Sequence, residues 1–324
     1  MLDDGRYWKM REIGGYFELE LEDRGEFIHD DGILVNTGRN ALELILSNLL
    51  NASKVYLPKY TCEVILEPFQ KLDIPYSFYL INYQLEIADE IVLGQDEYLL
   101  YTNYFGVKDN YVKQLVGLYP NRVIIDNAQA LFSEPTTMCF YSPRKFFGIP
   151  DGGIAYMDKP IEISEYEQDC SFDRCSHLLK RIDLGAGAGY ADFKDNSSLL
   201  KNQPIRKMSK LTQALLRTID FEKVKSKRRE NFAILHSLLG SSNKFKLDNL
   251  ESIACPMVYP YMTDDESVRQ RLINNKIFVA TYWPNVSEWC ESGTTELQLA
   301  QTIIPLPIDQ RYKEEALIEI FKLL

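Results

Sequence analysis

The sequence has few of the residues that metal centres and His-based catalytic sites need. Its 324 residues include only three histidines, His29, His177 and His236, and no two of them are close in sequence. The six cysteines are scattered and form no CxxC pair. Because metal centres and Ser-His-Asp triads need such side chains at suitable spacing, we predict neither a metal site nor a triad. We interpret the cysteines as buried thiols.

Positive charge is also scarce. The chain has 36 Lys and Arg against 47 Asp and Glu, which gives a formal net charge of -11. This balance argues against nucleic-acid binding, because phosphate contacts need clustered cations. A basic cluster, KSKRRE from Lys225 to Glu230, lies within a helical pattern, and we interpret it as a solvated or salt-bridged helix face.

Long apolar runs are missing as well. The longest, such as ALELILSNLL from Ala41, fall well short of the roughly 20 residues of a membrane span. The first residues, MLDDGRYWKMREIGG, do not have the pattern of a secretory signal. We therefore predict no membrane partner and a cytoplasmic protein.

Short β-rich runs alternate with helical patterns between residues 32 and 157. This alternation predicts an α/β fold with a mostly parallel sheet and helices on both faces. Ligands of such sheets bind beyond the carboxyl ends of the strands, so the residues that follow strands are the candidates for chemistry. The expected strands are GILVN, VYLP, YSFYLI, YLLYTNY, RVIIDNA, MCFYS and GGIAYM.

The second half of the chain is predicted to carry a smaller domain. Residues 185–203 are polar and rich in glycine, which predicts a loop or lid, and a long helical pattern runs from about Met208 to Leu239. The remainder alternates again through YPYM, ESVRQRLINN, IFVATYW and EEALIEIFKLL. We therefore predict a large domain over residues 1–207, and a connecting helix with a small C-terminal α/β domain over residues 208–324.

The first candidate strand end is Asn36-Thr37-Gly38-Arg39-Asn40, which opens directly into a helical pattern. Backbone N–H groups at a helix N-terminus, with a glycine that permits close approach, bind phosphate. The alternative is an ordinary turn in which Thr37 or Asn36 only caps the helix.

The second candidate is VIIDNAQA, where an apolar strand ends in Asp126 and Gln129 follows three residues later. A carboxylate at that position needs a partner. The alternative is that Asp126 caps the next helix.

The third candidate is Ser142-Pro143-Arg144-Lys145, which follows the strand MCFY and precedes FFGIPDGG. A lysine that attacks a carbonyl must be able to lose its proton, which burial or a neighbouring cation such as Arg144 promotes. Ser142, three residues earlier, could reach a phosphate. The alternative is a pair of exposed basic residues in a surface loop.

Together the three segments occur in the order that pyridoxal 5′-phosphate (PLP) chemistry requires: a phosphate cradle, an acid for the pyridinium nitrogen and a lysine for the Schiff base. Here the sequence resembles, as a divergent member, the DegT/StrS family of PLP-dependent nucleotide-sugar aminotransferases, which have the type I, aspartate aminotransferase-like fold. The resemblance covers most of the chain from about residue 33 onward. It is carried by Thr37-Gly38-Arg39-Asn40-Ala41-Leu42, Ile125-Asp126-Asn127-Ala128-Gln129-Ala130, and Lys145 with Pro150-Asp151-Gly152-Gly153.

The resemblance implies a role for each matched residue. Lys145 would bond covalently to PLP and act as general acid and base, and Asp126 would keep the pyridine nitrogen protonated. Gln129 would contact the phenolic oxygen of the ring. The implied reaction moves an amino group from a donor, usually glutamate, to a nucleotide-linked keto sugar in polysaccharide or glycan biosynthesis, and a homodimer is expected. The phosphate ligands would be Gly38, Arg39, Asn40 and Ser142, and the residue against the ring face Tyr60, Thr61 or Cys62.

The sequence also departs from the family pattern. Cys62 stands where the family has a ring-stacking aromatic residue, and Ile205 aligns with an asparagine that reaches the partner's cofactor. Arg39 could compensate through a charge-assisted phosphate bond. Two alternatives therefore stay open. One is a PLP-binding homologue with lost or altered turnover that acts in regulation or scaffolding. The other is the same fold with another ligand, although no GxGxxG motif supports it.

Overall fold

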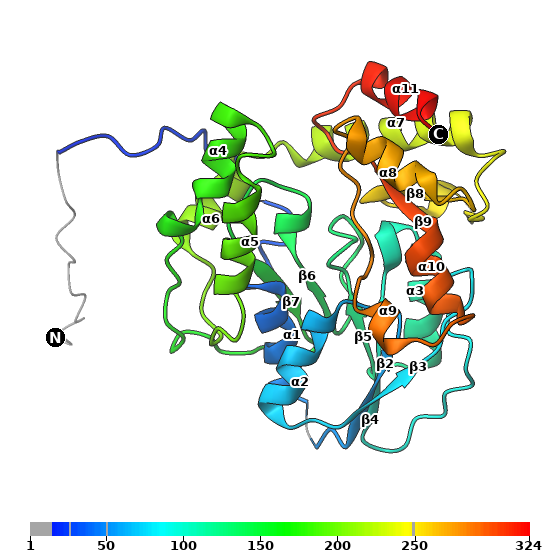
Figure 1. Cartoon of the computed structure of the whole chain (residues 1–324). Helices are drawn as coiled ribbons and strands as arrows, with labels where there is room; N and C mark the ends of the chain where they lie inside the picture. Colours follow the sequence, from blue (N-terminus) through cyan, green and yellow to red (C-terminus); the bar gives the residue numbers. More distant parts are fainter. Residues whose placement is uncertain (1–14, 26, 50, 248–249) are drawn as a thin grey trace, which may run out of the picture.

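A computed structural model describes residues 15–25, 27–49, 51–247 and 250–324 (Figure 1). Its strands form a seven-stranded and a two-stranded sheet. Each of the seven runs expected as a strand in the first half of the chain contributes one strand of the larger sheet. These strands are β1 (Ile33–Val35), β2 (Lys54–Pro58), β3 (Tyr76–Tyr79), β4 (Glu97–Thr102), β5 (Val123–Asp126), β6 (Cys139–Tyr141) and β7 (Gly153–Tyr156).

The larger sheet is mostly parallel, as predicted. Its strand order is β1-β7-β6-β5-β4-β2-β3. Strands β2 to β6 pair in parallel, whereas β7 runs antiparallel to β6 and β1 antiparallel to β7. The parallel strands therefore present their carboxyl ends at one edge.

Helices cover both faces of this sheet, which confirms the predicted layers. Alternate residues of a strand point to opposite faces, so Leu100 of β4 joins one apolar cluster and Leu99 and Tyr101 join the other. The first cluster is closed by α1 (Gly38–Ser47) and α2 (Leu66–Leu72), which follows the 3-10 helix η1 (Glu63–Ile65). The second is closed by α3 (Asp109–Leu118) and by helices of the second half.

The long helix predicted from Met208 to Leu239 is two helices, α6 (Lys210–Arg217) and α7 (Phe221–Leu239). The break is produced at Asp220, whose carboxylate accepts the backbone N–H of Lys223 and so caps a new helix. A sequence pattern tolerates a polar residue such as Asp220 inside a helix. In this structure that residue begins a second helix instead.

The basic cluster at residues 225–230 is only partly a solvated face. Lys227 pairs with Glu230 at 2.9 Å, as expected, but Arg228 is 2% exposed. Its guanidinium donates to the carbonyl oxygens of Met257 and Phe146 and to Gln310. The interpretation was wrong for Arg228 because packing encloses this position among backbone acceptors from other segments.

The smaller sheet pairs β8 (Val258–Met262) with β9 (Ile303–Pro307) in antiparallel fashion. The run IFVATYW forms no strand, and its place is taken by β9, whose residues are buried. Apolar residues from both halves of the chain share one core cluster. The domain boundary between residues 207 and 208 stays a prediction. The helices of this part are α8 (Ser267–Asn274), α9 (Val286–Trp289), α10 (Thr295–Thr302) and α11 (Glu314–Lys322), and η5 (Leu250–Ser252) precedes them.

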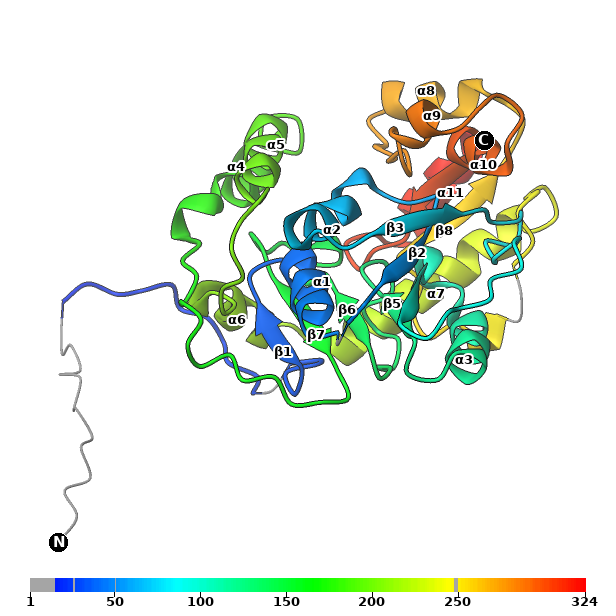
Figure 2. The same cartoon turned by 90° about the horizontal axis from the view of Figure 1, so that it is seen from below.

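The polar, glycine-rich segment was predicted as a loop or lid, and the loop prediction was wrong for residues 190–199, which form a helix. After η4 (Phe172–Arg174), α4 (Ser176–Leu184) ends at Gly185, and α5 (Tyr190–Leu199) follows. The two helices lie side by side and project from the sheet (Figure 2). Of the polar residues of α5, Lys194, Asp195 and Ser198 are exposed, while Asn196 is buried and donates to the carbonyl oxygen of Pro150. A helix with so much exposed surface resembles a loop in composition.

Candidate active site

The site lies at the carboxyl edge of the parallel strands. Thr102 ends β4, Asp126 ends β5, and Ser142 follows β6. Thr102 is the register partner of Asp126, and Asp126 that of Phe140, so the three strand ends are adjacent. The fold thus brings together residues that are up to about forty positions apart in sequence.

Asp126 is a buried carboxylate with few partners. It accepts the backbone N–H of Ala128 at 2.8 Å and the Thr102 hydroxyl at 3.4 Å. No helix begins directly after it, so the bond to Ala128 forms a local turn rather than a helix cap. Burial raises the pKa of Asp126, an effect that the charge of Lys145 opposes. Within the described chain no cation lies within 4.0 Å of this carboxylate.

Lys145 ends the 3-10 helix η3 (Pro143–Lys145) and is exposed. Its backbone N–H donates to the Ser142 carbonyl at 3.1 Å, which fixes the turn between the two residues. Its charge acts on both Asp126 and Cys62, lowering their pKa values against the effect of burial. The Lys145 charge therefore reaches the Asp126 carboxylate, although the lysine itself is exposed, and its role stays a prediction.

Of the three candidates for the ring face, Cys62 is the one whose thiol interacts with both Lys145 and Asp126. Tyr60 is fully buried, and its ring packs 5.1 Å from that of Trp283 and 5.5 Å from that of Tyr104. Tyr60 as a cofactor contact stays a prediction, and its position in the aromatic core favours Cys62 for that role.

Gln129 is buried and held in one orientation. Its side-chain oxygen accepts the backbone N–H of Phe105 at 2.8 Å, while its Nε2 has no hydrogen-bond partner. Gly106 allows this arrangement, because a Cβ there would lie 2.8 Å from the Gln129 carbonyl oxygen and its φ of 70° is left-handed. The result is a buried N–H donor that is still free to bind.

The helix-opening turn lies against Ser142. Thr37 caps α1 by accepting the N–H of Asn40 at 3.0 Å. A Cβ on Gly38 would lie only 3.2 Å from the Ser142 Cβ, so glycine permits the close approach of the two segments. Thr37 therefore caps the helix, as one interpretation of this turn has it. The N-terminus of the helix also lies beside the Ser142 hydroxyl at the carboxyl edge of the sheet, where a phosphate could bind.

The side chains of Arg39 and Asn40 already have partners. Arg39 pairs with Glu67 at 2.8 Å and donates to the Leu200 carbonyl at 2.6 Å. The Asn40 amide donates to Glu43 and to the Gln203 carbonyl. A phosphate contact by either side chain would replace these bonds, and both stay predictions.

The segment that carries Ile205 is fixed within the same chain. The backbone N–H of Asn36 donates to the Arg206 carbonyl, and its side chain donates to the Pro204 carbonyl and accepts from the Arg206 N–H. Ile205 packs against the apolar cluster under α1. It therefore serves the core and offers no polar group to a cofactor.

The loop after Lys145 is held by a buried ionic cluster. Asp151 is fully buried and accepts from Arg174 and from the Thr212 hydroxyl. Arg174 also pairs with Asp169 at 2.5 Å. Burial raises the pKa of Asp151, and the bonds from Thr212 and Arg174 oppose this. Asp151 thereby links the lysine loop to η4 and α6.

Two site residues were not found from sequence. Thr102 bonds Asp126, and its signal is a polar residue at the end of the apolar strand YLLYT. The second is Tyr282: burial, with a smaller effect of Cys62, raises the pKa of its phenol to about 12. No sequence signal places Tyr282 there, because it comes from the other half of the chain.

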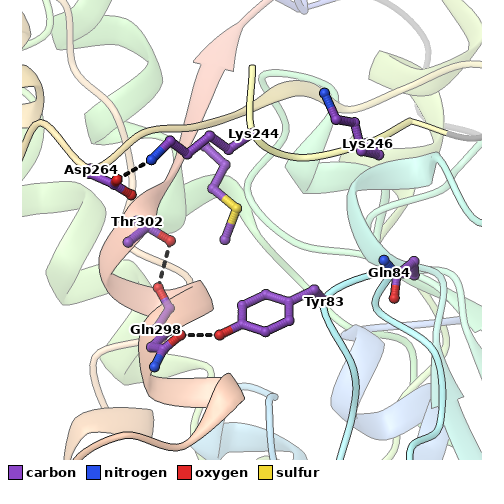
Figure 3. Close-up of a pocket in the computed structure, with 8 residues that line it drawn as sticks. Tyr83, Gln84, Lys244, Lys246, Asp264, Gln298 and Thr302 are labelled. Carbon is purple, nitrogen blue, oxygen red and sulfur yellow. Dashed lines mark hydrogen bonds and ion pairs between the residues drawn. The ribbon is translucent and has the colours of Figure 1, made fainter. Parts of the chain in front are cut away.

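A separate pocket of about 420 Å³ lies between the segment after β3 and the smaller sheet (Figure 3). None of its lining residues is a predicted site residue. In the described ranges no cluster of His, Cys, Asp and Glu could hold a metal ion. No helix there is both long and apolar enough to cross a membrane.

The sequence matches no protein-family model and no curated protein. The structure, in contrast, matches solved structures over 90% of the chain. DesV of S. venezuelae, crystallised with a ketimine intermediate, is similar with a TM-score of 0.62, 15% identity and 83% of its own chain covered. The sugar aminotransferase CalS13 of Micromonospora echinospora is similar with a TM-score of 0.61, 16% identity and 86% of its own chain covered.

A third similar structure is NtdA of Bacillus subtilis with bound cofactor PMP, with a TM-score of 0.60, 14% identity and 73% of its chain covered. The chain has the fold of the sugar aminotransferases. This confirms the predicted type I PLP-transferase architecture. At these low sequence identities the similarity shows the fold alone.

Proposed function

We propose that the protein is a PLP-dependent sugar aminotransferase in which Lys145 carries the cofactor. The observation that carries the proposal is the buried Asp126 carboxylate, which has two hydrogen-bond donors and no cation within 4.0 Å among the described residues. A buried charge without a partner is costly. Asp126 would hold the protonated pyridine nitrogen of PLP, which would supply the missing positive group, and Lys145, whose charge reaches Asp126, would hold the cofactor covalently.

Other features of this edge fit the same group. The free Nε2 of Gln129 matches a phenolic oxygen that accepts a hydrogen bond. The N-terminus of α1, with the Ser142 hydroxyl close beside Gly38, offers donors that match a phosphate. A carboxylate, an amide donor, an anion cradle and a lysine are the set of groups that PLP requires.

When bound, PLP supplies an electron sink that stabilises negative charge at the substrate's α-carbon. The protein's residues do the rest. Asp126, kept in place by Ala128 and Thr102, would hold a proton on the pyridine nitrogen. The Lys145 amine would be the group that bonds PLP covalently, and it would act as the general base and acid that moves a proton at the substrate carbon. Cys62 and Tyr282 border the same space and limit the access of water.

We propose glutamate as amino donor and a nucleotide-linked keto sugar as acceptor, in polysaccharide or glycan biosynthesis. Support comes from the folds that are similar: CalS13 is a sugar aminotransferase, and DesI was crystallised in the presence of its TDP-sugar product. The alternative is a homologue that keeps the cofactor without turnover. Retention of Lys145 at a position where its charge reaches Asp126 favours the enzyme.

We further propose a cytoplasmic homodimer. The α4–α5 hairpin exposes apolar side chains, including Leu179 at 58% and Ile182 at 81%. Exposed apolar side chains gathered on one projecting element are typical of an interaction surface. A second copy of the chain is the occupant that we propose for it.

The first experiment is spectroscopic. Protein purified with PLP should show a visible absorption band, and borohydride should remove it. Lys145→Ala should lack the band, whereas Lys210→Ala, which changes an exposed lysine of α6, should keep it. A wild-type protein that stays colourless with added PLP would contradict the proposal.

A second measurement separates turnover from cofactor binding. Addition of glutamate to the coloured protein should bleach the band as the amino group moves to the cofactor, and addition of a nucleotide keto sugar should restore it. A band that no amino donor changes would favour the non-catalytic alternative.

A further inference from the structure

Arg144 is a half-buried cation without a carboxylate partner. It lies on η3 between Ser142 and Lys145, and its Nη2 donates to the Ser197 hydroxyl at 3.3 Å. Its guanidinium carbon is 5.7 Å from the centre of the Phe193 ring. In the described part of the chain no carboxylate oxygen lies within 4.0 Å of it. Arg144 therefore contacts the Ser197 hydroxyl and the Phe193 ring, and neither group neutralises its positive charge.

The neighbouring arginines differ from Arg144 in this respect. Arg39 pairs with Glu67, and Arg174 pairs with Asp151 and Asp169. Asp151, whose charge reaches Arg144, is already bound by Arg174 and Thr212. Burial and the charge of Arg39 lower the pKa of Arg144 to about 10. Two cations thus face one region, and an anion there would relieve the repulsion between them.

Groups beside Arg144 also suit an anion. The residue Ser142 is 8% exposed, and its hydroxyl makes no hydrogen bond in the described structure. This hydroxyl lies 3.5 Å from the position of a Cβ on Gly38, at the N-terminus of the ten-residue helix α1. A serine hydroxyl without a protein partner lies beside the N-terminus of α1, and a guanidinium without a carboxylate partner lies two residues further along η3.

We propose that Arg144 binds the phosphate group of the cofactor, together with the Ser142 hydroxyl and the first turn of α1. This inference rests on the proposed function and adds to it the residue that neutralises the phosphate. A guanidinium suits this role because its planar fork matches two phosphate oxygens at once. It also supplies, within one chain, the polar contact that Ile205 cannot make, and it leaves Arg39 to hold α5 through Leu200.

The test compares PLP with pyridoxal, which has the same aldehyde and ring but no phosphate. The affinity of the apoprotein for each is measured through the visible band. In Arg144→Gln the preference for PLP over pyridoxal should fall about 10- to 100-fold, the usual effect of a lost hydrogen bond to a charged group. The affinity for pyridoxal itself should stay unchanged. Arg144→Lys should keep part of the preference.

Arg181→Gln is the matched control, because Arg181 is an exposed arginine of the adjacent helix α4. It removes the same formal charge and should leave the preference for PLP as it is. An equal fall in the affinities for PLP and pyridoxal in Arg144→Gln would show that Arg144 only supports the fold. A change confined to the affinity for glutamate would assign Arg144 to the donor's carboxylate. Either result overturns the inference.

A measurement without the cofactor separates this inference from the proposed function. Inorganic phosphate, followed by ³¹P NMR or calorimetry, should bind the wild-type apoprotein and compete with PLP, and it should bind Arg144→Gln at least tenfold more weakly. Equal phosphate binding in both proteins would overturn the role of Arg144. Phosphate binding that depends on Arg144, in a protein that forms no band with PLP, would support the anion site and end the aminotransferase proposal.

Discussion

The carboxyl edge of the large sheet and the α4–α5 hairpin differ in where they place polar and apolar side chains. At the sheet edge Asp126, Gln129 and Ser142 are buried, each at 8% exposure or less. On the hairpin Leu179, Ile182 and other apolar residues are exposed. Burial of polar groups costs free energy unless each finds a partner, and exposure of apolar groups forgoes the gain from their burial. Both regions are therefore incomplete in isolation, and each indicates what should complete it: a small polar ligand at the edge and an apolar surface at the hairpin.

The largest expected effect concerns the sheet edge. Lys145→Ala should lower the rate of 2-oxoglutarate release from glutamate by roughly 10²- to 10⁴-fold, the usual contribution of a general acid–base, even with saturating PLP. Lys210→Ala should retain the wild-type rate. A Lys145→Ala rate within tenfold of wild type would mean that another group moves the proton.

The next effect concerns the hairpin. The double variant Leu179→Glu, Ile182→Glu places two charges on its apolar surface and should raise the dimer dissociation constant about 100-fold, as loss of a buried interface contact does. Because both residues are exposed in the single chain, the free energy of unfolding of the monomer should change by only about 0.5 kcal/mol.

Analytical ultracentrifugation and denaturant unfolding would measure the two quantities. Lys180, on the same helix, forms an exposed ion pair with Asp192, and Lys180→Glu serves as the control that should leave the dimer intact. A wild-type protein that is monomeric, or a double variant that stays dimeric, would contradict this role of the hairpin.

The third effect lies where the two regions meet. Asp151→Asn weakens the buried bonds to Arg174 and Thr212 that tie the lysine loop to η4 and α6. Arg174 keeps Asp169, so the expected loss is about 1–3 kcal/mol of unfolding free energy, the typical cost of a broken buried hydrogen bond. Chemical denaturation would measure it. Asp173→Asn, an exposed site on η4, should cost nothing measurable.

The smallest effect is a pH-dependent gain of stability at the sheet edge. Burial raises the pKa of Asp126, so the folded apoprotein holds a proton more tightly than the unfolded chain does. The resulting stabilisation is present below the unfolded pKa of about 3.9 and is lost as the pH rises through the folded value. Asp126→Asn keeps the bond from Ala128 without the charge, and its apoprotein should be more stable than wild type at pH 7.

Urea midpoints between pH 4 and 8 would test this. The advantage of Asp126→Asn should shrink toward pH 4, and added PLP should stabilise the wild type more than the variant. A difference in stability that does not vary with pH would show that the carboxylate's charge is not what destabilises the apoprotein.

Much of the fold could be predicted from the sequence, because its signals are local. Alternation of apolar runs located the seven strands, and their parallel order followed from the helices between them. The predictions failed where contacts between distant segments determine the structure. Arg228 resembles a solvated residue of a basic cluster until the carbonyls of Met257 and Phe146 are brought to it. Residues 190–199 resemble a loop because a projecting helix has the polar composition of one.

By itself the sequence determined the order of the chemical groups: a helix-opening turn at Gly38, an acid at Asp126 and a lysine at Lys145, each directly after an apolar run. Only the tertiary structure decided which groups share a space, because strand register and packing set distances that spacing along the chain does not contain. It placed Cys62 beside Lys145 and Asp126, enclosed Tyr60 in the aromatic core, brought Tyr282 from the other half of the chain, and left Arg144 without a carboxylate. The partners of buried polar groups depend on how the chain packs. Packing therefore determines which side chains can act together at the candidate site.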